Sequence, residues 1–70
     1  SVSIQPGNLI KTTRARIGCP KGTVGFVTEC HSALDAVGEP IVVYVVKFHG
    51  IDNTRRIIEV DMEVLSEATL

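Results

Sequence analysis

Residues 6–11 read PGNLIK and residues 21–27 read KGTVGFV, and these two stretches decide the fold. In each of them glycine stands just before residues that favour β-strands, so a turn leads directly into a strand. The segment between them, residues 14–22, is basic and is expected to be a loop. The sequence therefore predicts the first half of a small all-β domain, in which two strands are joined by a basic loop.

The rest of the chain favours strands over helices. Its apolar runs are rich in β-branched residues, and residues 50–53 predict a hairpin turn because glycine, aspartate and asparagine tolerate positive φ. Helical composition occurs only at residues 31–37, where Gly38 and Pro40 limit a helix to a turn or two. We therefore predict five strands, at residues 8–13, 23–31, 41–49, 54–60 and 63–66.

The predicted connections suggest how these strands are arranged. An acidic loop near residues 32–40 joins the second and third strands, and a tight step at Asp61-Met62 leads to the fifth. A long first loop, a tight distal hairpin and a short last strand are similar to those of SH3-like barrels. Because a chain of 70 residues holds one small core, we expect a single all-β domain over residues 1–70, a five-stranded SH3-like barrel.

The two opening stretches also resemble a KOW-type motif, which is found in ribosomal and transcription proteins. In that motif a glycine turn opens one strand and a Gly-x-x-Gly-x-Val element opens the next. Here Gly7 occupies the first turn, and Gly22, Gly25 and Val27 match the second element. The resemblance covers residues 6–30 and implies the fold more strongly than it implies binding of nucleic acid.

Composition excludes several classes of protein. Hydrophobic residues make up 44% of the chain, which is too many for a disordered protein. The longest apolar run, residues 41–46, is far shorter than the roughly 20 residues of a membrane-spanning helix, and no secretory leader is recognisable. Cys19 and Cys30 are too few for a disulfide framework. We therefore expect a cytoplasmic protein with reduced thiols, although a single Cys19–Cys30 bridge stays open.

The formal net charge of −1 hides an uneven distribution. Residues 1–21 contain four cations and no acid, whereas residues 59–70 contain four acids and no base. This distribution leaves three alternatives. The basic end binds an anionic partner, the basic end of one copy binds the acidic end of another, or the two ends pair within one chain. The cations are Lys11, Arg14, Arg16 and Lys21, and the acids are Glu59, Asp61, Glu63 and Glu67.

The third predicted strand is apolar on both faces. Val42, Tyr44, Val46 and Phe48 share one face, and Ile41, Val43 and Val45 share the other. A strand with water on one side normally alternates apolar and polar residues. Either a strongly bent barrel buries both faces, or the second face is covered by another copy of the chain. Ile41, Val43 and Val45 are therefore the predicted oligomer interface.

No catalytic or metal site is expected. Cys19 stands near Arg16 and Lys21, whose charges lower a thiol pKa, but no base accompanies it. Cys30 and His31 are adjacent on a strand and point to opposite faces, so they do not share one metal ion; Cys30 is expected to be a small core residue. We predict no catalytic residue, no metal, no cofactor, no small-molecule substrate and no membrane partner.

Three functions remain. The first is a non-enzymatic binding or assembly module that associates with itself or docks on a protein partner. The second is a KOW-like nucleic-acid or ribonucleoprotein accessory factor, although a pI of 6.0 and three aromatic residues count against it. The third is a small regulatory subunit of a larger enzyme. The residues predicted to contact phosphates or a protein partner are Lys11, Arg14, Arg16, Lys21, Arg55 and Arg56.

Overall fold

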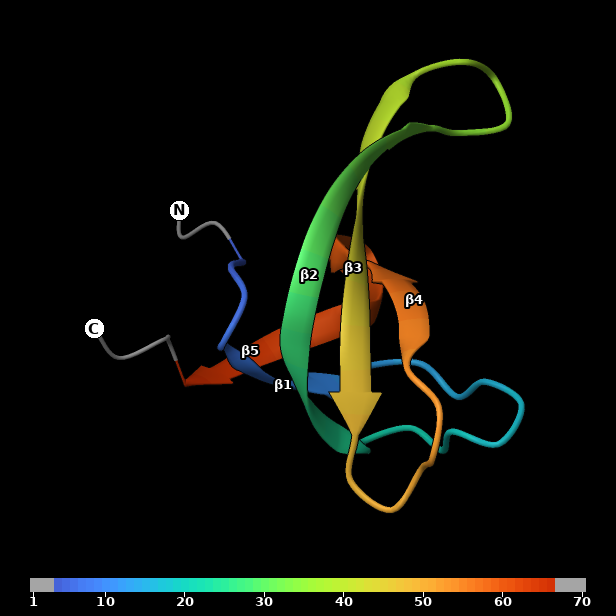
Figure 1. Ribbon diagram of the computed structural model, residues 1–70. Coiled ribbons are helices and arrows are strands. Elements are labelled where there is room, and N and C mark those ends of the chain that lie inside the picture. The colour runs from blue at the N-terminus through green and yellow to red at the C-terminus, as the bar shows by residue number, and fades with distance from the viewer. Residues whose placement is uncertain (1–3, 67–70) are drawn as a thin grey trace.

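The computed structural model describes residues 4–66, with Ser66 described by its backbone alone. Five β-strands form one antiparallel sheet in the order β4-β3-β2-β1-β5 (Figure 1). The predicted all-β class and the five strands are confirmed. The elements are β1 (Leu9–Thr12), β2 (Val24–Leu34), β3 (Pro40–Phe48), β4 (Arg55–Ile58), the 3₁₀ helix η1 (Glu59–Asp61) and β5 (Met62–Ser66).

The sheet is open within the described residues, because its edge strands β4 and β5 each pair with a neighbour on one side only. Strand pairing therefore does not close the predicted barrel. The step into the last strand also begins earlier than predicted. β4 ends at Ile58, and η1 makes the change of direction over Glu59–Asp61 before β5 starts at Met62.

Gly25 allows the central strands to approach closely. It lies in β2 between Ile10 of β1 and Phe48 of β3. A Cβ atom placed on Gly25 would lie 2.7 Å from the carbonyl oxygen of Lys47 and 2.8 Å from the Phe48 ring. The second glycine of the Gly-x-x-Gly element is therefore required for packing, because only glycine leaves room for the neighbouring backbone.

One face of the sheet carries the core. Tyr44, Val46 and Phe48 of β3 are buried, as expected for residues that alternate along one face. The prediction that Cys30 is a core residue is wrong: Cys19 from the first loop is buried, and Cys30 is exposed. The apolar core consists of Ile4, Ile10, Cys19, Val27, Tyr44, Val46, Phe48, Ile57 and Met62.

The hairpin of β2 and β3 extends beyond the rest of the sheet (Figure 1). We call residues 29–42 the arm. It begins after an irregularity in register between Val27 and Glu29, and its two strands have no pairing with β1 or β4. The predicted loop near residues 32–40 is shorter in the structure: residues 32–34 continue β2, and residues 35–39 make the connection to β3. The helical composition of residues 31–37 forms no helix. Cross-strand pairing continues to Leu34 and Pro40, which satisfies the backbone without helical turns.

The turn at the end of the arm, residues 35–39, is organised by one side chain. Asp35 Oδ1 accepts hydrogen bonds from the amide nitrogens of Val37 (3.0 Å) and Glu39 (2.9 Å). The amide of Gly38, at φ +83°, donates to the carbonyl oxygen of Asp35. Aspartate at the start of a turn commonly satisfies following amides in this way. We call residues 34–39 the tip of the arm, and its turn is ordered even though it is surrounded by solvent.

Candidate partner-binding site

The basic loop between β1 and β2 is held by Thr12. This buried side chain donates to the carbonyl oxygen of Pro20 (3.0 Å) and accepts from the amides of Gly22 (3.0 Å) and Thr23 (3.2 Å). At the other end of the loop, the backbones of Arg16 and Cys19 exchange hydrogen bonds of 2.8 and 2.9 Å. These contacts fix the loop from which the predicted cationic side chains project.

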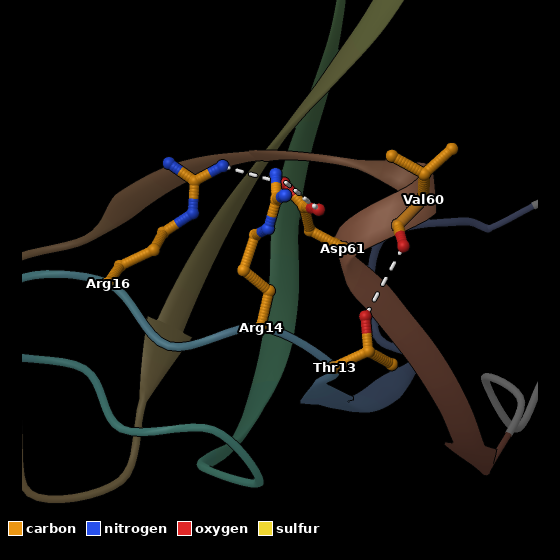
Figure 2. A network of polar contacts seen from close by, with 5 residues as sticks. All are labelled: Thr13, Arg14, Arg16, Val60 and Asp61. Atoms are coloured by element: carbon orange, nitrogen blue, oxygen red, sulfur yellow. Dashed lines mark hydrogen bonds and ion pairs between the residues drawn. The ribbon is translucent and has the colours of Figure 1, made fainter.

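Two of those cations clamp a buried carboxylate (Figure 2). Arg16 Nη2 donates to Asp61 Oδ2 at 2.7 Å, and Arg14 Nη1 lies 3.8 Å from Asp61 Oδ1. The amide of Thr13 donates to the Asp61 carbonyl oxygen (2.9 Å), and its hydroxyl donates to the carbonyl oxygen of Val60 (3.3 Å). Asp61 therefore ties η1 to the first loop. Pairing of the basic and acidic ends within one chain was one of the three alternatives drawn from the charge distribution, but the sequence does not specify that Arg16 and Asp61, 45 residues apart, are partners.

Lys11 and Arg55 are also engaged within the chain. Lys11 Nζ lies 3.5 Å from Glu63 Oε2 across the β1–β5 pair, and Arg55 Nη1 donates to the carbonyl oxygen of Ile17 at 2.9 Å. Within residues 4–66, Lys21 and Arg56 have no carboxylate at ion-pair distance. Three of the four cations near the N-terminus thus pair with acids of the last segment. Glu67, the fourth of those acids, lies outside the described residues.

The predicted interface residues Ile41, Val43 and Val45 lie on the face of β3 opposite the core, and all three are half-buried. Val43 stands opposite His31 of β2, and Val45 stands opposite Glu29. The His31 ring nitrogen Nε2 lies 3.1 Å from Glu29 Oε1, so a polar pair flanks the two valines. The role of these three residues as an interface stays a prediction.

A groove with a volume of about 720 Å³ opens on the outer face of the sheet, at the end remote from the arm. Leu9, Val24 and Phe26 line it and remain 42–45% exposed, although they are large and apolar. They lie together because Leu9 pairs with Phe26 in the β1–β2 register and Val24 is two residues from Phe26. The remaining lining residues are Thr23, Gly25, Lys47, Phe48, His49 and Gly50.

Sequence reasoning did not single out this groove, although the signal was present. Leu9, Val24 and Phe26 alternate along their strands with the buried residues Ile10 and Val27. The first two strands are therefore apolar on both faces, which is the same pattern that drew attention to the third strand. Phe26 is exposed, unlike the other two rings, Tyr44 and Phe48.

The reactive side chains are arranged as follows. Both cysteines are free thiols, and Cys19 is buried away from solvent. Burial raises the pKa of Tyr44 above its usual value, and the nearby Glu59 carboxylate and Cys30 thiol raise it further.

Within residues 4–66, no three side chains of the histidine, cysteine, aspartate or glutamate type gather as a metal site would require. The same residues form no helix of the length and apolarity needed to cross a membrane.

The chain was compared with protein-family models, with curated proteins and with solved structures. It matches no family model, no curated protein and no solved structure.

Proposed function

We propose that this protein is a non-enzymatic binding and assembly module built as an SH3-like barrel, and that it associates with further copies of itself. The position of β2 between two strands supports the barrel. This strand pairs with β1 over its first residues and with β3 from Gly25 to Leu34. The short helix η1 between β4 and β5 fits the same architecture.

The groove is the observation that carries the proposal. Leu9, Val24 and Phe26 form one exposed apolar patch on a chain of only 70 residues. Burying about half of each such side chain contributes on the order of 1 kcal/mol per residue. A contiguous apolar patch of this kind commonly marks a protein-binding surface, and it promotes aggregation when nothing covers it. A partner that covers the groove therefore gains most of its binding energy there.

The ion pairs count against the nucleic-acid alternative. Lys11, Arg14 and Arg16 are paired with Glu63 or Asp61. A phosphate that bound these cations would have to compete with the carboxylates, and binding of nucleic acid depends on cations that neutralise phosphates.

The buried position of Cys19 likewise counts against a thiol nucleophile. A regulatory subunit of an enzyme would use the same apolar groove, so no separate observation favours that function.

The test is the mass of the protein in solution across a range of concentrations, measured by sedimentation equilibrium. We expect a mass that rises with concentration above the monomer value of 7.6 kDa. A constant monomer mass up to millimolar concentration would refute self-association. Fluorescence anisotropy with labelled RNA and DNA oligomers at low salt is the matched measurement, and tight binding there would favour the alternative function.

A further inference from the structure

We propose that the tip of the arm of one copy occupies the outer-face groove of the next copy, so that copies assemble head to tail. This inference rests on the self-association proposed above and specifies how it occurs. Its basis is that the tip and the groove are complementary in polarity, in charge and in position on the molecule.

The tip presents apolar side chains on an ordered turn. Leu34 is 70% exposed and Val37 is 82% exposed, so both side chains project into solvent. The hydrogen bonds that Asp35 accepts from the Val37 and Glu39 amides fix the turn before any partner arrives. Binding through such a turn loses little conformational entropy, because its backbone is already ordered.

The charges of the two surfaces are opposite. Residues 22–46 carry three carboxylates and no lysine or arginine, and two of these acids, Asp35 and Glu39, are in the tip. The groove carries Lys47 and His49, and no acid is among its lining residues in the described part of the chain. Glu63, the acid beside the groove on β5, is paired with Lys11. An apolar tip with two carboxylates therefore meets an apolar groove whose lining residues include the positive charge of Lys47 and no acid.

Lys47 is held in place at the edge of the groove. Its ammonium group donates to the carbonyl oxygens of Phe48 and Ile51, so these contacts orient the charge without neutralising it. An ammonium group has three N–H donors, and one remains for a carboxylate of an incoming tip.

A tip does not reach the groove of its own chain. Val24 lines the groove and Leu34 begins the tip, and the two stand at opposite ends of the 11-residue strand β2. At about 3.3 Å per residue, this separation is on the order of 30 Å. Figure 1 shows the arm and the β3–β4 turn at opposite ends of the molecule. The contact must therefore be intermolecular.

A tip-in-groove contact joins two different surfaces, so each copy keeps one free tip and one free groove. Such heterologous contacts form rings when the rotation between copies closes and filaments when it does not. Each contact is made by one turn and one groove, so a single contact is expected to be weak and to become weaker at high salt because opposite charges contribute to it.

The experiment uses two variants of the full chain, Val37→Glu in the tip and Val24→Glu in the groove. Val60→Glu is the matched control, because Val60 is an exposed valine of η1, which contributes nothing to either surface. Each variant alone is expected to stay at the monomer mass at concentrations where the wild type and Val60→Glu associate. An equimolar mixture of the tip and groove variants is expected to give a dimer with twice the monomer mass, because one intact tip meets one intact groove.

The outcomes separate this inference from the proposed function. If the wild type associates and Val37→Glu associates equally well, the tip-in-groove contact is refuted while self-association stands. If each variant is monomeric and the mixture also stays monomeric, the contact is not heterologous and the inference fails. If the wild type itself is a strict monomer, self-association and the inference fail together. Circular dichroism verifies folding, and Val24→Thr replaces Val24→Glu if the charged variant does not fold.

Discussion

The two ends of β2 differ both in sequence and in environment. Residues 24–27 pair with β1 on one side and β3 on the other, whereas residues 29–34 pair with β3 alone. Gly25 and Val27 are buried in the first part, and every residue from 29 to 34 is exposed. A single strand therefore serves as the centre of the sheet at one end and as a projecting ribbon at the other. Burial of β2 therefore coincides with the presence of a second neighbouring strand, and the apolar sequence of residues 24–27 matches that environment.

The largest test of this difference replaces a glycine in each part. Gly25→Ala places a methyl group 2.7 Å from the Lys47 carbonyl oxygen, and overpacking against backbone is expected to lower the free energy of unfolding by about 3 kcal/mol. Gly38→Ala, in the turn of the arm, meets no atom within 4 Å but has φ +83°, which costs about 1 kcal/mol. Urea denaturation measures both changes. Equal losses would show that the close contacts of a methyl group at Gly25 cost no more than the positive φ at Gly38.

The sequence could predict the centre of the sheet better than the arm. Apolar runs rich in β-branched residues, together with turn signals, predicted all five strands, and the alternation of side chains placed Tyr44, Val46 and Phe48 on one face, which is buried. The prediction failed at residues 32–34, which continue β2 instead of starting the loop, because the turn-forming residues of this region resemble those of a longer loop. Exposure of a strand on both faces depends on whether a neighbour pairs with it, and pairing is decided by residues distant in the sequence.

The candidate site was predictable to a similar extent. Arg14, Arg16 and Lys21 are in the expected loop, and Asp61 was among the acids expected to pair if the two ends met, but the sequence did not predict that it binds both arginines. Its partners are brought together only when η1 lies beside the first loop. The groove, in contrast, followed from a pattern already visible in the sequence, since Leu9, Val24 and Phe26 alternate with buried neighbours.

A second test examines whether the first loop and η1 belong to the same cooperative unit as the centre of the sheet. Asp61→Asn removes the charge that Arg16 and Arg14 contact, and loss of a charged hydrogen bond at a buried side chain is expected to lower the free energy of unfolding by about 1–2 kcal/mol. The control is Glu63→Gln, which breaks the exposed pair with Lys11 and is expected to cost less than about 0.5 kcal/mol. Thermal or urea unfolding measures both. A negligible effect of Asp61→Asn would show that the clamp does not contribute to folding.

The smallest expected effect concerns Tyr44, which stands opposite Cys30 where the arm leaves the rest of the sheet. Burial, and then the charge of Glu59, raise its pKa above the ordinary value of 10.0. In the unfolded chain the phenol loses its proton first, so the folded state holds more protons and the free energy of unfolding falls as pH rises above about 10. Tyr44 is the only tyrosine, so tyrosinate absorbance reports it alone. We expect the titration midpoint of Tyr44 to be higher in native protein than in urea, and we expect Tyr44→Phe to lose less stability at alkaline pH than the wild type. Identical midpoints in the two states would mean that water reaches the phenol freely, and the boundary between the buried sheet and the exposed arm would then lie closer to the core than Tyr44.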